Sequence, residues 1–425
     1  MWETLRNAWK VEELRKKLIY TFLMLVLFRL VGVIPVSGIN AAVVKEVAGN
    51  YDMLGLVNMM TGNSFSQMTI MAMGITPYIN SSIIMQLLTV AIPALERLQK
   101  DGGEEGKQKI NRITRYVTVA LAALQAIGII AGLQKSGNVL YPAYQNFFGY
   151  MTIGVIMAGG TALAMWIGER ITKNGIGNGV SLLIFAGIIS NIARGVEVGV
   201  YGLFSSAVES NVGGMIASVL VFIILIVGIV IVDLGERRIP IQYAKRMVGR
   251  KMYGGQSTHI PLKLNSSGVL PLIFANAIMQ FPATILAFFP NSKANLWWSA
   301  HVQMMSWPYQ IIFALMIFGF TFFYSSISFN PVEIAKNIQN NGGMIPGIRQ
   351  GKPTSDFIKK ISGRITCFGA IYLAILAVIP TIIYAIFGVQ LTFAASSLMI
   401  AVSVAMESMR QLESEMMMRH YKGFL

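Results

Sequence analysis

The chain has very little of the chemistry that enzymes and disulfide-bonded domains use. Among its 425 residues there are one cysteine and three histidines. Cys367 alone cannot form an intrachain disulfide. His259, His301 and His420 lie in separate segments, with no cysteine or carboxylate at the spacing of metal ligands. The sequence therefore predicts no catalytic residues, no metal site and no cofactor, and it predicts that the protein is not an enzyme.

Nucleotide-binding motifs are also missing from the sequence. Next to the segment Gly102–Lys107 (GGEEGK), Asp101 stands where the first glycine of a phosphate-binding loop belongs, and Gln108 stands where Ser or Thr would bind Mg²⁺. The NGIGNG motif at 174–179 follows no strand of a nucleotide-binding unit. Its glycines predict a tight turn with positive φ angles. The chain therefore has no predicted means of using ATP itself.

Long apolar segments are abundant, since 54% of the residues are hydrophobic and only 12% are charged. A helix needs about 20 apolar residues to cross a bilayer, and most of these segments are near that length. The pattern predicts an all-α polytopic membrane protein. The ten predicted spans are Leu18–Pro35, Ile70–Pro93, Tyr116–Leu133, Gly149–Ile171, Val180–Ala193, Gly214–Val232, Gly268–Phe289, Tyr309–Phe329, Ile365–Phe387 and Leu391–Met406.

The basic residues lie mainly on one side of these spans. Of the 34 lysines and arginines, 29 lie on this side: 28 in the two tails and the four alternate loops, and Arg170 at the end of the span Gly149–Ile171. Short loops rich in Lys and Arg stay in the cytoplasm, so this face and both termini are predicted to be cytoplasmic. Val180–Ala193 is short enough to be re-entrant. In that case, however, the basic residues of all later loops would be exported, which favours ten crossings.

Ten crossings divide into two halves of five, 1–195 and 196–425. Because each half has an odd number of crossings, the second half enters from the opposite side, which makes an inverted repeat. Between the first two spans, Tyr51–Ser66 is apolar enough to enter the membrane and too short to cross it. We expect a short re-entrant segment enclosed by the protein, with an amphipathic helix at the outer interface as the alternative.

Several spans are unusually polar. Polar side chains at membrane depth usually face a bundle interior or a wet cavity, although each one could instead form an ordinary interhelical hydrogen bond. Their concentration in the second, third and seventh spans predicts a shared polar seam. They are Asn80, Ser81, Ser82, Gln86, Thr89, Gln125, Asn276 and Gln280.

The two longest loops on the basic side carry further structure. Gly235–Ala244 and Gln256–Leu264 alternate in polarity around a basic turn, which predicts a cytoplasmic β-hairpin. In the loop 329–364, NPVEIAKNIQ predicts a short helix ahead of a glycine-rich stretch. Basic loop tips suit docking of a partner, and a merely solvated charged surface is the alternative. The hairpin turn carries Lys245, Arg246, Arg250 and Lys251.

Five long motifs, in order along the whole chain, resemble the SecY/Sec61-alpha family of protein-conducting channels. They are GITPYINSSIIMQLL (Gly74–Leu88), MWIGERITKNGIGNGVSLLIFAGI (Met165–Ile188), GGQSTHIPLKLNSSGVLPLIFA (Gly254–Ala275), FNPVEIAKNIQNNGGMIPGIRQGKPT (Phe329–Thr354) and ESMRQLESEMMMRHYKGF (Glu407–Phe424). The last is most similar to versions from Gram-positive bacteria. The resemblance implies a channel in the bacterial plasma membrane that passes unfolded secretory proteins and releases membrane helices sideways.

The resemblance also implies which residues line the pore. Its narrowest ring would consist of isoleucines, with Asn276 or Ala277 at a sixth position. The spacing itself adds only that Ile79 and Ile83 share one helix face. Apolar side chains suit this role because they bind no particular peptide and exclude ions by dewetting. The implied ring is Ile79, Ile83, Ile184, Ile273 and Ile400.

A plug and a lateral gate are implied in the same way. Tyr51–Ser66 would be the plug helix that closes the outer funnel, and Asn63 and Ser64 stand where relatives often have a glycine run. The polar seam would be the lateral gate. The implied plug residues are Leu54, Leu56, Met59, Met60 and Gly62, and the implied gate residues are Gln86, Thr89, Gln125, Asn276 and Gln280.

Partners follow from the resemblance as well. A chain with no nucleotide site needs an external energy source, which in the family is the SecA ATPase or a translating ribosome. The implied subunits are SecE and SecG, and signal sequences are the opening ligands; membrane lipids, SecDF and YidC complete the implied set. Arg349, in the PGIR motif, is the residue assigned to motor coupling. The implied docking residues, in the loops 235–268 and 329–364, are Lys245, Arg246, Arg250, Lys251, Arg349 and Lys352.

Two other functional classes compete with a protein channel. An ion-coupled secondary transporter also uses five-plus-five inverted repeats. That class usually needs an ionisable residue near the middle of a span, and the predicted spans have none there. Arg29 is the only charge well inside a span, and the sequence favours snorkelling or a contact with a partner. The third class is a passive docking scaffold, for which no mutant of the protein should conduct ions.

Overall fold

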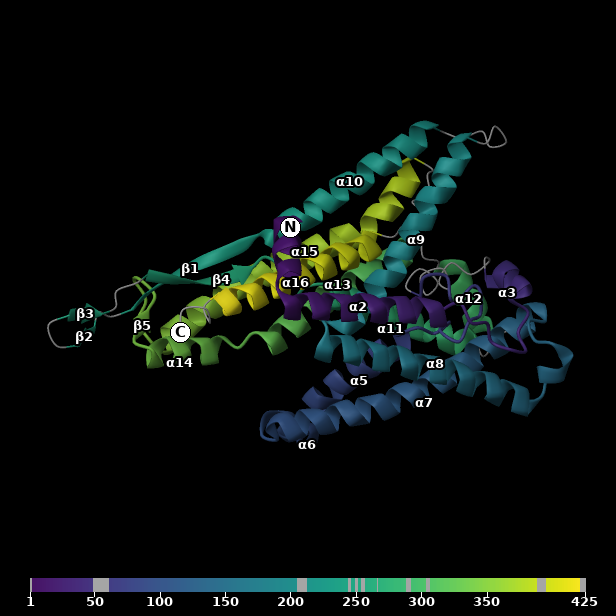
Figure 1. Ribbon diagram of the computed structural model, residues 1–425, viewed down its shortest axis with the longest axis horizontal. Helices are drawn as coiled ribbons and strands as arrows, with labels where there is room; N and C mark the ends of the chain where they lie inside the picture. The colour runs from purple at the N-terminus through teal and green to yellow at the C-terminus, as the bar shows by residue number, and fades with distance from the viewer. Residues whose placement is uncertain are drawn as a thin grey trace. The chain divides into compact units, whose positions relative to one another are not determined.

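The computed structural model describes residues 2–48, 61–204, 212–243, 246–248, 251–253, 257–265, 267–287, 292–302, 306–387 and 395–420 (Figure 1). Contacts between residues divide the chain into two compact units that interleave in the sequence. The predicted division at 195/196 into an inverted repeat stays a prediction. The first unit is Met1–Met215, Asn276–Tyr309 and Leu391–Leu425, and the second is Ile216–Ala275 and Gln310–Gln390.

The described residues of the first unit are mainly helical. Helices α7 and α8 pack together, α5 packs against α7, and α9 packs against both α8 and α16. The helices are α1 (Trp2–Lys10), α2 (Glu12–Val31), α3 (Ala41–Ala48), α5 (Thr76–Ala91), α6 (Pro93–Lys100), α7 (Gly103–Gly137), α8 (Phe147–Asn174), α9 (Gly179–Phe204), α12 (Lys293–His301) and α16 (Ala395–His420), with a 3₁₀ turn at Pro142–Tyr144.

Small residues allow α7 and α8 to approach closely. A Cβ at Gly154 of α8 would lie 2.6 Å from Cγ1 of Ile127 on α7, which is closer than real Cβ contacts. Alanine and isoleucine side chains fill the interface, with Ala126 and Ile130 from α7 and Ile153 from α8 among the buried residues. Close packing through small residues is a usual way for helices to associate in a membrane.

The chain bends by 105° between α5 and α6. Pro93 occupies the first position of α6, where its fixed φ and missing N–H are tolerated, and Ile92 before it is extended. The predicted span Ile70–Pro93 becomes helical only at Thr76, because residues 61–75 run as turns. Gly74, at φ +53°, belongs to this non-helical segment.

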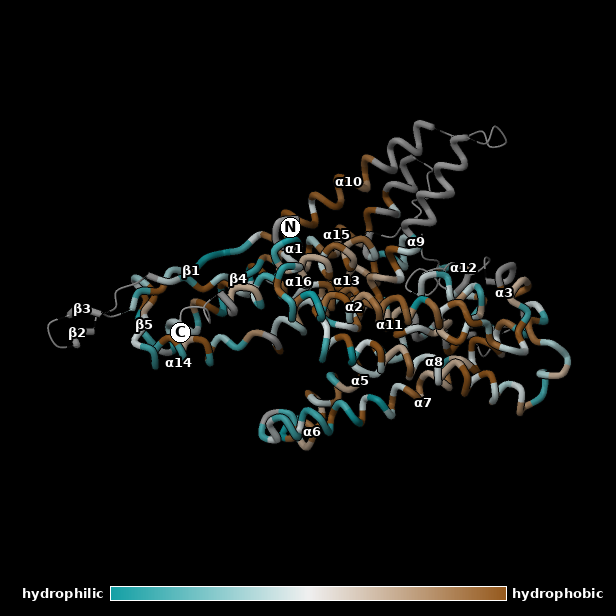
Figure 2. Tube along the Cα trace, in the orientation of Figure 1, coloured by the Kyte–Doolittle hydropathy of each residue, from teal (hydrophilic) through white to brown (hydrophobic). Residues whose placement is uncertain are grey.

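Figure 2 shows that α7 changes along its length from hydrophilic at the α6 end to hydrophobic. This change agrees with the predicted transition from a charged loop to the span Tyr116–Leu133. Helix α15 repeats the pattern, since its first turns carry Lys359, Lys360 and Arg364 and its later turns are apolar.

The second unit combines apolar helices with two small β-sheets. Helices α10, α11 and α13 each cross a boundary between the units, so only part of each belongs here. The elements are α10 (Val212–Leu234), β1 (Glu236–Tyr243), β2 (Arg246–Val248), β3 (Lys251–Tyr253), β4 (Ser257–Lys263), α11 (Leu270–Ala287), α13 (Trp307–Ser328), α14 (Pro331–Asn340), β5 (Gly343–Met344) and α15 (Lys352–Phe387).

A three-stranded antiparallel sheet joins the two long loops of this unit. The strand order is β4-β1-β5, with Ile239 opposite Ile260 and Tyr243 opposite Gly343. The strands β1 and β4 coincide with the two extended stretches read from the sequence, and the short pair β2 and β3 continues from them (Figure 1). The sequence did not reveal β5, which links the loop 329–364 to the same sheet.

Isoleucines on one face of the sheet build the core under it. The inward positions of β1 alternate with exposed ones. Asn330 caps α14 by accepting hydrogen bonds from the N–H groups of Val332 and Glu333, with Pro331 at the first helical position. The two loops therefore form one packed body. Its buried residues are Ile239, Ile241, Leu262, Ile338, Ile345, Ile358 and Ile365.

Each of the ten predicted spans contains a helix in the described part of the chain. By length and composition alone, four helices there are able to cross a membrane, or five if the bent pair α5 and α6 is one span. The four are Gly103–Lys135, Phe147–Asn174, Trp307–Asn340 and Lys352–Ile379, and the shorter apolar helices are Gly179–Asn191, Leu220–Leu234 and Leu270–Met279.

Candidate functional site

The five isoleucines of the predicted ring all lie on helices and are all buried, with side chains no more than 7% exposed. Ile79 and Ile83 are on α5, Ile184 is on α9, and Ile400 is on α16. These four belong to the first unit, and α9 and α16 pack against each other there. Ile273, on α11, belongs to the second unit. The closure of a ring stays a prediction.

The predicted polar seam is partly buried. Thr89 on α5, Gln125 on α7 and Asn276 on α11 are each less than a tenth exposed, whereas Gln86 is exposed. Thr89 donates a hydrogen bond to the Gln86 carbonyl at 2.8 Å, within its own helix. The side chain of Gln280 lies outside the described residues.

Two polar atoms on α5 are buried without a hydrogen-bond partner among the described residues. They are Oδ1 of Asn80 and Oγ of Ser81. Leaving a buried polar group unsatisfied costs about 1–3 kcal/mol. Helix α5, which packs against α7, therefore carries more polar groups than its packing in this structure satisfies.

The segment 61–75 is attached to the end of α2. The N–H of Val36 donates to the Met68 carbonyl at 2.9 Å, and the N–H of Ile70 donates to the Ile34 carbonyl at 2.9 Å. Of the predicted plug residues, Gly62 begins this segment. Leu54, Leu56, Met59 and Met60 lie outside the described residues.

Arg29 of α2 reaches both this segment and α9. Its Nη1 donates a hydrogen bond to the Gly62 carbonyl at 3.3 Å, and its Nη2 donates to Oγ of Ser190. The structure thus shows bonds within the chain, while the expected snorkelling or contact with a partner stays a prediction. Its position as a lone charge in an apolar span was the sequence signal that identified it, but that signal did not indicate its bonding partners.

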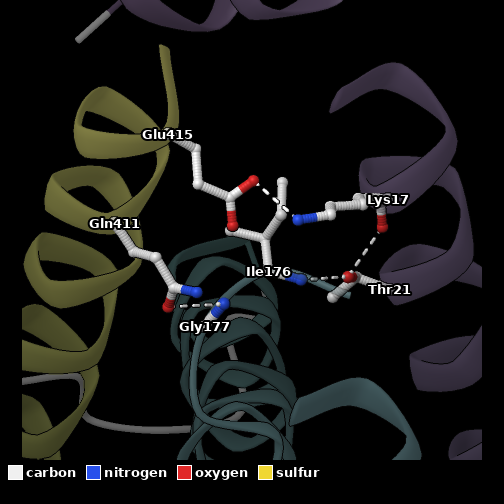
Figure 3. A network of polar contacts seen from close by, with 6 residues as sticks. All are labelled: Lys17, Thr21, Ile176, Gly177, Gln411 and Glu415. Carbon is white, nitrogen blue, oxygen red and sulfur yellow. Dashed lines mark hydrogen bonds and ion pairs between the residues drawn. The ribbon is translucent and has the colours of Figure 1, made fainter. Parts of the chain in front are cut away.

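A second polar network ties α2 and α16 to the turn between α8 and α9 (Figure 3). The Oγ1 of Thr21 accepts from the N–H of Ile176 at 3.1 Å and donates to the Lys17 carbonyl at 2.9 Å. The Lys17 ammonium binds the Glu415 carboxylate at 2.7 Å. Gly177, at φ +85°, lies in the predicted tight turn, whereas Gly175 and Gly179 of the same NGIGNG motif do not have the predicted positive φ. No local pattern predicts this network, because most of its partners are far apart in the chain.

An apolar cluster lies beside this network. It consists of the buried residues Ala8, Leu14, Ile176 and Leu412. The N-terminal helices, the α8–α9 turn and the last turns of α16 thus share both a hydrophobic core and polar contacts. The helix that carries Ile400 is held at its far end by these residues.

Exposed basic side chains stand on the packed loops of the second unit. Arg349 is exposed, while its carbonyl accepts a hydrogen bond from Oγ1 of Thr354 at 2.8 Å. The neighbouring Gln350 donates to the Gly343 carbonyl of β5 at 2.9 Å. Lys352 is also exposed. The backbone that presents Arg349 is therefore fixed independently of its side chain.

The basic hairpin turn is only partly described. Arg246 and Lys251 lie on the paired strands β2 and β3, where Lys251 is opposite Val248. Lys245 and Arg250 lie outside the described residues.

Apolar helices long enough to span a membrane, with polar side chains buried between them, define the class of a polytopic helical membrane protein. The family model named SecY matches residues 69–409. The chain belongs to the SecY family.

Similar proteins cover nearly its whole length. The protein translocase subunit SecY of Streptomyces galbus is 40% identical, covering 99% of this chain and 98% of that protein. The SecY subunit of Mycobacterium tuberculosis is 41% identical, with the same coverage of each chain.

Solved structures share the fold. A protein-conducting channel matches with a TM-score of 0.69 at 20% identity, covering 94% of this chain and 92% of that chain. Sec61 from a canine ribosome-channel complex matches with a TM-score of 0.61 at 17% identity and the same coverage. The fold is therefore that of the SecY and Sec61 channels.

Proposed function

We propose that this chain is the channel subunit of a bacterial Sec translocon, which conducts unfolded secretory proteins across the plasma membrane and releases membrane helices sideways. The observation that carries the proposal is the 40% identity to SecY translocase subunits over 99% of the chain. The buried isoleucines on α5, α9 and α16 support it, because they lie at the positions that the family motifs assign to the pore.

The proposed topology has ten crossings in two inverted halves, with both termini in the cytoplasm. The helix found within each predicted span supports this count, and the distribution of basic residues supports the orientation. In this topology the sheet β4-β1-β5 and helix α14 project into the cytoplasm.

The pore would close in two places. The isoleucine ring would exclude ions by dewetting when no chain passes. Tyr51–Ser66 would be the plug outside that ring, as in the SecY structure whose plug domain is described as stabilising the closed state and maintaining a membrane seal. Helix α5 belongs to the proposed lateral gate. The unpaired polar atoms of Asn80 and Ser81 support the proposal that α5 contacts different partners when the gate opens.

Transport would depend on partners that supply energy. The exposed Arg349 and Lys352, on a backbone fixed by hydrogen bonds, suit docking of SecA or a ribosome. Solved neighbours of this fold are bound to ribosomes, namely canine Sec61 and yeast Ssh1. SecE and SecG would be the accompanying subunits, and a signal sequence would open the channel.

Reconstitution tests the proposal directly. Vesicles containing this chain with SecE should, on addition of SecA and ATP, protect a secretory precursor from external protease. Omitting ATP is the control, and it should abolish protection. No protection with SecA, SecE and ATP all present and the chain correctly folded would rule out the proposed function.

A further inference from the structure

A charged side chain inside an apolar helix needs compensation, and Arg29 obtains it within the chain. It lies on α2 between the buried Phe28 and the exposed Leu30. An ionised side chain at membrane depth is costly and usually marks a function. Arg29 is itself only half-buried, so its position on the helix does not by itself explain the charge.

The guanidinium joins two separate elements to α2. One nitrogen donates to the carbonyl of Gly62 in the segment 61–75, and another donates to the hydroxyl of Ser190 on α9. The planar fork of arginine presents several donors in fixed directions, so one side chain can hold two acceptors at once. Lysine has a single nitrogen at the end of its chain and cannot copy this arrangement.

The carbonyl of Gly62 lies where the backbone turns sharply. Gly62 and Asn63 are consecutive residues with φ of +63° and +73°. A Cβ at Gly62 would overlap the Arg29 guanidinium, so glycine allows the close approach. Asparagine is among the few other residues that adopt such φ values, so Asn63 can follow Gly62 in this turn.

The residues that follow are held by further bonds to the stretch just after α2. Ser64 donates to the Gly32 carbonyl at 3.2 Å, and the backbone bonds at Met68 and Ile70 continue the attachment. Phe65 and Met68 are buried in the core that α7 and α8 provide. The segment from Gly62 to Ile70 is therefore attached to residues 32–36, which directly follow α2, and Arg29 attaches its first residue to α2 and α9.

From this arrangement we infer that Arg29 is a positioning residue that holds the Gly62 turn and α9 against α2 and thereby stabilises the closed channel. The inference rests on the proposed function as a gated pore. Because α9 also carries Ile184, the same guanidinium connects the base of the plug with a pore-lining helix. Opening would require these two hydrogen bonds to break or exchange.

The inference is tested by measuring the resting ion conductance of vesicles that contain this chain in complex with SecE. Arg29→Gln should raise it about tenfold, since losing a charge-assisted hydrogen bond shifts a two-state equilibrium by about that factor. Ser190→Ala should raise it by less. The double variant should equal Arg29→Gln alone, because both substitutions remove one shared contact. Arg29→Lys should leak like Arg29→Gln, whereas rescue by lysine would show that charge alone matters and would overturn the inference.

Arg115→Gln is the matched control. Arg115 also binds across two helices, to Glu169 at 2.7 Å, but it contacts neither the segment 61–75 nor α9 through that bond. Its conductance should equal that of the parent protein. Ser190→Ala keeps the test decisive if Arg29→Gln fails to assemble, because removing one half-buried hydroxyl leaves the backbone of α9 intact. Parental conductance in Ser190→Ala would then overturn the inference.

Deleting Leu56–Asn63 distinguishes the proposed plug from the proposed role of Arg29. Raised conductance after this deletion, with parental conductance in Arg29→Gln and Ser190→Ala, would overturn the inference and leave the proposed plug in place. Parental conductance after the deletion as well would overturn the plug and, with it, the role of Arg29.

Discussion

The backbone N–H of Gly177 donates a hydrogen bond to Oε1 of Gln411 at 3.0 Å, although 234 positions separate the two residues in the chain. Gly177 lies in the turn between α8 and α9, and Gln411 lies on α16 (Figure 3). Helix α16 is continuous from Ala395 to His420 and carries Ile400 near its start. The position of a proposed pore residue thus depends on polar contacts three turns further along the helix.

The Thr21 hydroxyl is expected to contribute measurably to stability. Thr21→Val keeps the shape of the side chain but removes the acceptor for the buried N–H of Ile176. An unsatisfied buried donor costs about 1–3 kcal/mol, so the midpoint of thermal unfolding of the purified complex should fall. Thr21→Ser retains the hydroxyl and should unfold closer to the parent. An unchanged midpoint in Thr21→Val would contradict this role of the hydroxyl.

The ten-span topology can be tested with single cysteines in a Cys367→Ser background. Cysteines that replace Lys107, Arg250 or Lys352 should be labelled only from the cytoplasm, because basic loops are retained there. Asn138 and Asn295 should be labelled only from outside. Membrane-impermeant maleimide applied to intact cells and to inverted vesicles distinguishes the two faces. Labelling of Arg250 from outside would contradict the model of ten crossings.

Much of the fold follows from local sequence, and the contacts that position the site do not. Apolar length predicted a helix in every span, and alternation of polarity predicted the strands that became β1 and β4. Strand β5 has only two residues, Gly343 and Met344. So short a strand has no periodicity of its own, and its pairing with Tyr243 depends on two loops meeting in space.

The same limit applies to the polar contacts. The sequence marked Arg29 as unusual, but its acceptors Gly62 and Ser190 are a backbone carbonyl and a common hydroxyl, which carry no pattern. The start of α5 at Thr76 was also missed, because Ile70–Ile75 is apolar enough to read as part of the span. Gly74, with its positive φ, was the local signal for a later start.

Reversing the charge of Arg349 should uncouple the motor from the channel. The side chain is exposed and its backbone is fixed by Thr354, so Arg349→Glu should fold and assemble with SecE. It should lose SecA-driven transport, because a carboxylate cannot offer the donors of a guanidinium. The measurements are SecA ATPase stimulation and precursor protection in vesicles. Lys336→Glu, an exposed charge reversal on α14 of the same loop, is the control and should remain active. Normal transport by Arg349→Glu would make Arg349 a solvated surface charge.

Placing a polar group at Ile400 should weaken closure of the pore. Ile400 is 3% exposed on α16, which packs against the helix of Ile184. Ile400→Asn introduces a side chain that water can solvate and so lowers the dewetting barrier. A change of about 1.4 kcal/mol in the balance of closed and open states shifts it tenfold, enough to export precursors with defective signal sequences and to raise resting conductance. Ile400→Leu keeps the apolar volume and should resemble the parent in both assays. If Ile400→Asn also resembles the parent in both, Ile400 packs in the helical core and does not line the pore.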